Sequence, residues 1–176
     1  MRHFESRQEL ARGQGRGTAG AANTPSIATV IVPLDGSLAA EGVLKMAGDV
    51  ARCSGAALVL LHVVPYPEPL EARPTHGAVW PDTEELPPDV LEAIGEAQRY
   101  LDALGQAIGA TGTVVRVGDP FSRIRQEART LDRSLIVLTS KATATARVGQ
   151  HSELARRLAF SHVAPVLMVP PPESQP

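Results

Sequence analysis

Five short apolar runs, separated by stretches with the apolar spacing of helices, constrain the fold of this chain more than any other feature. The runs are mostly Val, Ile and Leu, which is typical of parallel strands that are covered on both faces. They occupy residues 27–32, 57–64, 113–117, 135–139 and 166–169. Helices are predicted over residues 38–53, about 91–108, 121–131 and 154–158. Alternating strands and helices predict an α/β fold with a parallel sheet and right-handed crossovers.

Local signals set the expected ends of the first helix. Ser37 is a candidate N-cap, and Gly55 is expected to end the helix. The second strand contains His62, which we expect to be a hydrogen-bonded core histidine. Residues 65–90 hold seven of the fifteen prolines, so a long crossover loop is predicted there. The apolar stripe of the first helix is formed by Val43, Met46, Ala47 and Val50.

Length and composition narrow the class of protein. The 176 residues fit one domain, expected at residues 27–170, with a flexible basic tail at 1–26 and a C-terminal tail at 171–176. The net charge of −2 and the few aromatic residues (one Trp, two Tyr and three Phe) argue against nucleic-acid binding. No apolar run could span a bilayer, and the lone Cys53 gives no sign of an oxidising compartment. A cytoplasmic protein without membrane partners is therefore expected.

Familiar catalytic and metal-binding patterns are missing. Residues 15–20 match G-x-G-x-x-G, but no strand precedes them, so they do not predict a dinucleotide site. The histidines show no ligand spacing with each other or with Cys53. Neither Ser140 nor Ser152 lies in a G-x-S-x-G motif. The sequence therefore predicts no catalytic residues and no metal ligands.

Four segments resemble the universal stress protein family in order and spacing. They are the strand and turn at residues 31–37, the strand end at 61–64, the turn at 117–120 and the closing strand at 165–169. The resemblance extends over residues 27–170. It implies a three-layer, five-stranded parallel sheet of order 3-2-1-4-5 with four helices, the adenine nucleotide alpha hydrolase-like architecture. It also implies a homodimer that pairs through the last strand, at Val166, Leu167, Met168 and Val169.

The last strand also has a physical reason to pair. Pro165 and Pro170 flank a short apolar strand that is expected at the sheet edge. An exposed apolar edge aggregates unless it is short, covered or paired, and pairing with a second copy satisfies its backbone groups. The residues themselves thus favour a homodimer.

Many members of the resembled family bind ATP, which implies a nucleotide site at the carboxyl ends of the strands. In the family, the phosphate loop reads G-x-x-G, nine residues, then G-[Ser/Thr] at the start of the last helix. The corresponding positions here are Thr139, Ala142 and the pair Ser152-Glu153, so every glycine is replaced. The complete set of candidate site residues is Pro33, Asp35, Val64, Leu138, Thr139, Ala142, Ser152 and Glu153.

These replacements act against a bound phosphate. A left-handed backbone at Thr139 would cost about 1–2 kcal/mol. The Glu153 carboxylate at the start of the last helix would repel a phosphate about 4 Å away by about 4 kcal/mol at an effective dielectric near 20. We expect Lys141 and Arg147 to offset only part of this repulsion. We therefore predict a degenerate phosphate site whose helix terminus is capped by Glu153, with no cofactor expected and ATP as the candidate if one binds.

Two classes of function remain open. The first is a non-catalytic stress-response module that dimerises and contacts unknown protein partners. The second is an ATP-binding switch or weak ATP hydrolase with a non-standard loop that uses Lys141 and Arg147. Asp35 is expected either to lie beside an adenosine or to accept hydrogen bonds from turn amides. Val64 is expected either to line a base pocket or to cover the sheet edge.

Overall fold

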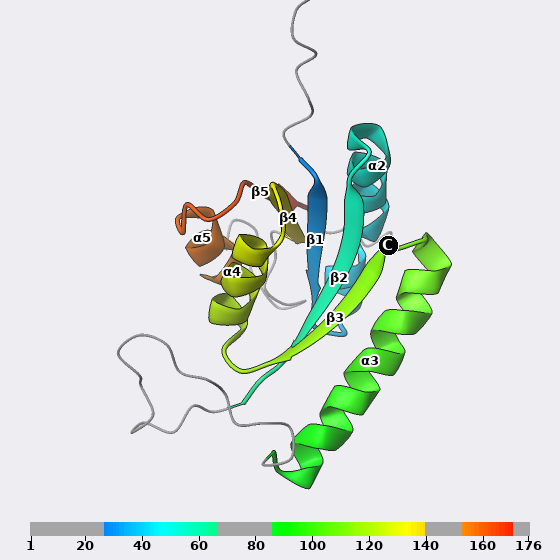
Figure 1. The fold of residues 1–176 in the computed structure, drawn as a ribbon, viewed down its shortest axis with the longest axis vertical. Coiled ribbons are helices and arrows are strands. Elements are labelled where there is room, and N and C mark those ends of the chain that lie inside the picture. Colours follow the sequence, from blue (N-terminus) through cyan, green and yellow to red (C-terminus); the bar gives the residue numbers. More distant parts are fainter. Residues whose placement is uncertain (1–26, 67–85, 140–152, 171–176) are drawn as a thin grey trace, which may run out of the picture.

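A central parallel sheet organises the molecule (Figure 1). The computed structural model describes residues 27–66, 86–139 and 153–170. Its strands are β1 (Thr29–Leu34), β2 (Ala57–Val64), β3 (Gly112–Val117), β4 (Ser134–Thr139) and β5 (Val166–Val169). They pair in parallel in the order β3-β2-β1-β4-β5, which confirms the predicted fold class and strand order.

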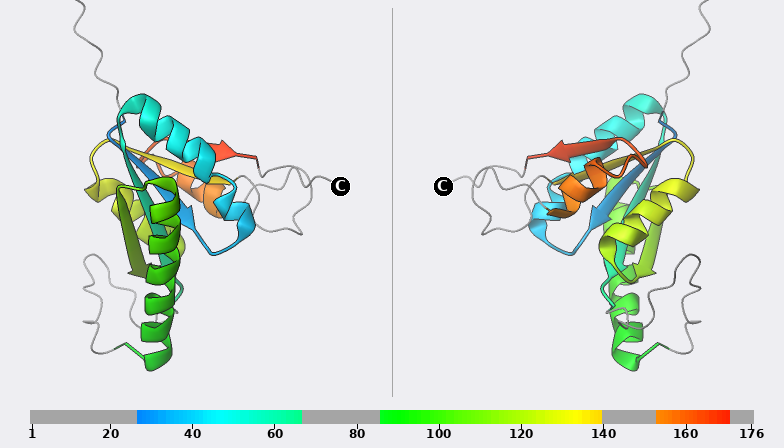
Figure 2. Two further views of the ribbon diagram at one scale, coloured as in Figure 1. Left: turned by 90° about the vertical axis from the view of Figure 1, so that its right-hand side faces the viewer. Right: turned by 90° about the vertical axis from the view of Figure 1, so that its left-hand side faces the viewer.

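Helices cover both faces of the sheet and give three layers (Figures 1 and 2). The side chain of Val30 in β1 shares one core cluster with Leu101 of α3 (Pro88–Ile108), and its neighbour Ile31 shares the opposite cluster with Leu158 of α5 (Glu153–Ala159). This alternation follows from the two-residue period of a strand. The described helices are α1 (Leu38–Glu41), α2 (Leu44–Ser54), α3 (Pro88–Ile108), α4 (Pro120–Thr130) and α5 (Glu153–Ala159).

The helix predicted over residues 38–53 is interrupted, so this prediction was wrong in its continuity. Gly42 and Val43 separate α1 from α2, and glycine is the poorest helix former after proline. The interruption changes which side chains face the core. Ala47 is fully buried as expected, but Met46 is 46% exposed and does not belong to the apolar stripe.

The two predicted helix caps of this region are confirmed. The Ser37 Oγ accepts a hydrogen bond from the Ala40 N–H at 3.2 Å and caps α1. Gly55 ends α2 with a φ of 66°, in the left-handed region that glycine enters without steric cost. β2 covers residues 57–64 as predicted, whereas β1 extends to Leu34, two residues beyond the predicted strand. Short side-chain signals thus place these boundaries well.

Several predictions concern residues outside the described ranges. These are the tails at 1–26 and 171–176, most of the crossover loop predicted over 65–90, and the candidate site residues Ala142 and Ser152. The domain limits consequently stay a prediction. No helix within the described part of the chain combines the length and apolar character needed to cross a bilayer.

Candidate functional site

The carboxyl ends of β1 and β4 lie at the point where the chain changes direction across the sheet. Helix α3 packs with α2 on one face, and α4 packs with α5 on the other. The register between β1 and β4 stops at Ile31 and Ile136. Beyond it, β1 stays paired with β2 as far as Leu34, and β4 stays paired with β5 as far as Thr139. The two central strands are therefore unpaired with each other at the switch point, where ligands of such sheets bind.

The turn after β1 places Asp35 at this point. The Asp35 carboxylate accepts hydrogen bonds from the Ser37 backbone N–H at 3.0 Å and from the Ser37 hydroxyl at 2.6 Å. Gly36 has a φ of 82°, which a side chain would strain. Pro33 lacks an N–H and pairs with Leu61 of β2. The interpretation of Asp35 as a turn residue is thus confirmed, and its exposed carboxylate still faces solvent.

Val64 ends β2 and contacts α3. Its side chain is 6% exposed and belongs to a core cluster with Val90 and Ala97. Its carbonyl accepts a hydrogen bond from the Gly118 N–H at 3.0 Å, which ties β2 to the turn before α4. The predicted role of Val64 as a cover of the sheet edge agrees with this packing.

A polar group beneath the β1 turn was not found from the sequence. The Tyr100 hydroxyl of α3 donates a hydrogen bond to the Glu41 carboxylate of α1 at 2.9 Å, and the ring of His62 meets that of Tyr100 edge to face at 6.2 Å. Burial, then the hydrogen bond to Glu41, raises the pKa of Tyr100 above its usual value. The periodicity of α3 identified its apolar side but gave no sign of a contact with a residue 59 positions away.

His62 differs from the expectation of a hydrogen-bonded core histidine. Its Nδ1 atom is buried and finds no hydrogen-bond partner among the described residues, so that prediction was wrong for this nitrogen. Burial lowers the pKa of His62, while the nearby Asp35 carboxylate and the Leu34 carbonyl oppose the shift. The imidazole is therefore disposed to stay neutral, which lessens the cost of its unsatisfied nitrogen.

The other half of the site follows β4. Leu138 is 5% exposed and packs in the cluster under α4 and α5. Thr139 is the last residue of β4 and pairs with Val169 of β5. Among the described non-glycine residues, positive φ angles occur at Arg133 and His162. The left-handed strain considered for Thr139 is therefore absent, because this residue lies in extended backbone.

Glu153 begins α5 but is paired within that helix. Its carboxylate accepts hydrogen bonds from Arg156 Nε at 2.9 Å and from Arg156 Nη2 at 2.8 Å. The hydrogen bond from Arg156 lowers the pKa of Glu153, so the carboxylate stays ionised. The sequence led us to expect this charge against the amides at the start of the helix. Pairing with Arg156 instead reduces the field that Glu153 presents to an anion.

The geometry thus brings Asp35 and Thr139 to the ends of two neighbouring strands, with Pro33, Val64 and Leu138 in the strands themselves. Asp35 and Glu153 are the acidic members of the predicted set, and neither is buried. No group of three or more metal-ligating side chains occurs in the described ranges. The arrangement can hold a polar ligand through Asp35 and backbone groups.

Comparison with solved structures finds the same architecture. A universal stress protein from Burkholderia pseudomallei is 27% identical, with a TM-score of 0.54, and the match covers 82% of this chain and 97% of that one. A universal stress protein in complex with cAMP is 21% identical, with a TM-score of 0.53 and coverage of 82% and 97%. A universal stress protein from Archaeoglobus fulgidus in complex with dAMP is 21% identical, with a TM-score of 0.52 and coverage of 81% and 96%.

Sequence comparison gives the family. No curated protein matches the chain. The profile of the Universal stress protein family matches residues 27–170, which include every described strand and helix. The order of the strands, the turn at Asp35 and this match agree with one another. The chain therefore belongs to the universal stress protein family.

Proposed function

We propose that this universal stress protein is a dimeric, non-catalytic stress-response module whose phosphate loop does not hold a triphosphate. The observation that carries the proposal is the ionised Glu153 carboxylate at the start of α5, with its charge shared with Arg156. A loop that binds phosphate offers unoccupied amides and glycines at this place. Here Glu153 adds a carboxylate at the first position of α5, where it pairs with Arg156, and Thr139, at the first glycine position, continues a strand.

The edge strand supports the dimer in this proposal. β5 pairs with β4 on one side and is the outer strand of the described sheet. Its four residues lie between Pro165 and Pro170, and Met168 is 40% exposed. An apolar edge of this length is suited to pairing with the same strand of a second copy.

A second candidate function is the binding of an adenine nucleotide at the β1–β2 half of the site. The exposed Asp35 carboxylate beside Gly36 favours it, because this half keeps the turn expected in a nucleotide-binding relative. Solved relatives in complex with cAMP and dAMP add support for a ligand that carries a single phosphate. In this case the sugar and base would supply the affinity, and the outer phosphates would add none.

Calorimetric titration with adenosine, AMP and ATP tests both functions. We expect either no binding of any ligand, or affinities for adenosine and ATP within about threefold, because the altered loop gives the triphosphate no advantage. A low-micromolar ATP dissociation constant that is at least tenfold tighter than that for adenosine would overturn the proposal of a degenerate loop.

A gain-of-function variant makes the test sharper. Thr139→Gly, Ala142→Gly and Glu153→Ser together restore the small residues of the phosphate loop and should tighten ATP binding without changing adenosine binding. Glu92→Ser, which removes an exposed glutamate on α3, is the matched control for the loss of one negative charge. An equal gain in the control would show that net charge, and not the loop, limits ATP binding.

Sedimentation velocity tests the dimer. Met168→Asp places a charge on the outer strand and should shift the protein to the monomer, and Leu167→Pro should do the same by removing an amide from the middle of β5. Met46→Asp is the matched control, since Met46 on α2 is exposed to a similar degree. A wild-type protein that is monomeric at high micromolar concentration would contradict the proposed dimer.

A further inference from the structure

Unpaired acidic groups concentrate on one helix. Within the described ranges, the carboxylates of Asp35, Glu41, Asp49, Asp102, Asp119, Glu127, Asp132 and Glu153 all take part in hydrogen bonds or ion pairs. The remaining three are exposed and form no ion pair or hydrogen bond with the described residues. They are Asp89, Glu92 and Glu96 in the first half of α3, and we call them the acidic face.

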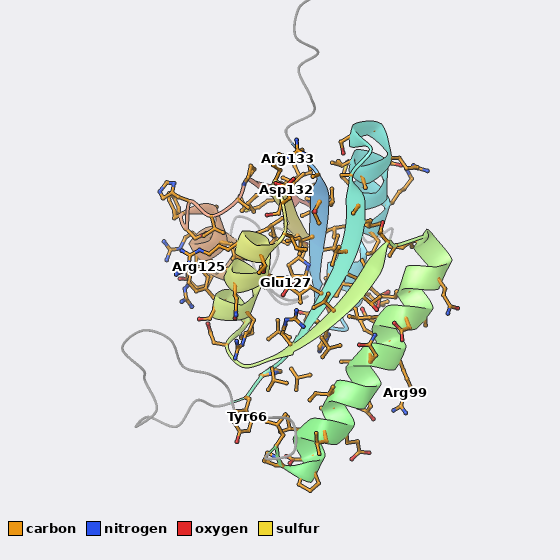
Figure 3. The ribbon with its side chains drawn as sticks, viewed as in Figure 1. Tyr66, Arg99, Arg125, Glu127, Asp132 and Arg133 are labelled. Carbon is orange, nitrogen blue, oxygen red and sulfur yellow. The ribbon has the colours of Figure 1, made fainter. Side chains whose placement is uncertain are left out.

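Unpaired arginines concentrate on a different pair of helices. Arg125 and Arg129 of α4 and Arg157 of α5 form no ion pair with a described carboxylate, and we call these three the arginine face. Arg99 of α3, one helical turn after Glu96, also forms none with a described carboxylate, but it stands alone on that helix. A shallow groove of about 410 Å³ runs beside Arg125 and Arg129, and none of its lining residues is acidic. Figure 3 shows Arg125 on the outer side of α4, whereas Glu127 points toward the sheet.

One aromatic ring holds two of these arginines in place. The Arg157 guanidinium carbon lies 4.0 Å from the centre of the Phe121 ring, and that of Arg125 lies 5.7 Å from the same centre. Stacking on a ring leaves the N–H groups at the edge of a guanidinium free for a carboxylate. Because their positions are already restricted, these side chains lose less conformational freedom when they bind a partner.

The acidic face and the arginine face have matching spacing but cannot meet within one chain. Glu92 and Glu96 are one helical turn apart, as are Arg125 and Arg129, so each pair repeats at about 5–6 Å. Helix α3 covers one face of the sheet, and α4 and α5 cover the other (Figures 1 and 2). Only a second molecule can bring the two sets of charges together.

We propose that the acidic face of one copy docks on the arginine face of the next copy. The two surfaces differ, so the contact is not two-fold, and each docked pair keeps one free acidic face and one free arginine face. Successive copies can therefore add to the assembly. The contact is distinct from the proposed pairing through β5, and it does not depend on a bound nucleotide. Carboxylate–guanidinium pairs at an exposed surface are individually weak, so the association should depend strongly on salt.

Light scattering and sedimentation velocity at several salt concentrations test the proposal. The Debye length falls from about 30 Å at 0.01 M salt to about 3 Å at 1 M. We expect the average mass of the wild type to rise with protein concentration at low salt and to return to a constant value at high salt. A mass that does not change with salt at high micromolar protein would overturn the proposal.

Charge reversal identifies the surfaces. R125E/R129E makes the arginine face acidic, and E92R/E96R makes the acidic face basic, so each variant alone should lose the salt-dependent association. A mixture of the two should regain it, since the reversed surface of each variant complements the reversed surface of the other. Failure of the mixture to associate, while both variants keep the wild-type circular dichroism spectrum, would overturn the proposed contact.

A matched control separates this contact from a general effect of charge. K45E/R52E changes the net charge by the same amount as R125E/R129E, but on α2, away from both faces. We expect this control to associate like the wild type. An equal loss in K45E/R52E would mean that total charge governs the association, which would contradict a specific contact between the two faces.

Discussion

The two helical layers are attached to the sheet by different kinds of polar interaction. In the layer of α1, α2 and α3, neutral donors make the polar contacts. The Thr113 hydroxyl of β3 donates to Asp102 of α3, and the Tyr100 hydroxyl of α3 donates to Glu41 of α1 within the layer. In the layer of α4 and α5, the Ser134 hydroxyl of β4 donates to the Ala128 carbonyl of α4 at 2.7 Å, and an ion pair is added to this neutral hydrogen bond. The Glu127 carboxylate of α4 is 7% exposed and pairs with Arg116 of β3 at 3.0 Å.

Because of this difference, the stability of the two helical layers should respond differently to mutation, salt and pH. A hydrogen bond from a neutral hydroxyl to a solvent-accessible carboxylate is worth about 1 kcal/mol and depends less on salt than an ion pair does. A buried carboxylate is tolerated only while its partner stays in place, so its loss costs more than the pair contributes. We therefore expect the α4–α5 layer to respond to the removal of a charge, and the α3 layer to respond to packing and to protonation of His62.

Truncation of the α3 core should have the largest effect. Leu101 is fully buried between α3 and the sheet, so Leu101→Ala should lower the free energy of unfolding by about 2–5 kcal/mol. Leu91→Ala, on the same helix at 43% exposure, is the control and should change it by less than about 1 kcal/mol. Urea denaturation measures both. Equal effects would mean that α3 contributes little to the folded core.

Breaking the ion pair between Arg116 and Glu127 should cause the second-largest loss in the free energy of unfolding. Arg116→Met leaves the Glu127 carboxylate without its partner and should cost about 1–3 kcal/mol, since Arg116 is 46% exposed and water can reach the site. Arg116→Met with Glu127→Met should recover most of the loss. Arg133→Met, which breaks an exposed pair with Asp132, should cost under about 1 kcal/mol. A double variant as unstable as the single one would contradict this account.

Removing the neutral donor that joins α3 to α1 should lower the free energy of unfolding by less. Tyr100→Phe deletes the hydroxyl that bonds to Glu41 and should cost about 1 kcal/mol by chemical denaturation, with little dependence on salt. Tyr66→Phe is the control, because no hydrogen bond of the Tyr66 hydroxyl to the described residues is recorded. A strong salt dependence in Tyr100→Phe would remove the contrast between the layers.

The pH dependence carried by His62 should be the smallest effect. Burial lowers the pKa of His62 in the folded protein, so the unfolded chain binds more protons and the free energy of unfolding rises with pH. This contribution is fully present above the unfolded value near 6.5 and is lost as the pH falls through the folded pKa. Thermal melts between about pH 7.5 and 5 should show a shallower decline in His62→Gln than in the wild type. His162→Asn, at an exposed position, should leave the decline unchanged.

The sequence predicted those parts of the fold that depend on neighbours along the chain. Ser37 and Gly55 cap helices through groups within a few residues, so both were found by pattern. The strands were found because burial on both faces leaves an apolar run. The interruption at Gly42 was missed, because a single glycine in the sequence is compatible both with one continuous helix and with two helices of different direction. Packing in the folded chain decides between them.

In the candidate site, too, local features were predictable from the sequence and contacts between distant residues were not. The turn at Asp35 was predictable, since an Asp followed by Gly and Ser forms its hydrogen bonds locally. The bond between Tyr100 and Glu41 depends on two helices that meet only in the folded chain. Glu153 was placed correctly at the start of the last helix, but the choice of Arg156 as its partner depends on side-chain geometry that spacing does not determine.

The position of β1 has a consequence for synthesis on the ribosome. The strand at the centre of the sheet emerges early, but its neighbour β4 begins only at Ser134 and the outer strand β5 only at Val166. Nascent chains that stop before residue 166 leave the backbone N–H and C=O groups of β4 unpaired on one side, where they can capture strands of other chains. We expect the protein to need protection by chaperones until the final strand has left the exit tunnel, and slow codons in that region to increase its aggregation.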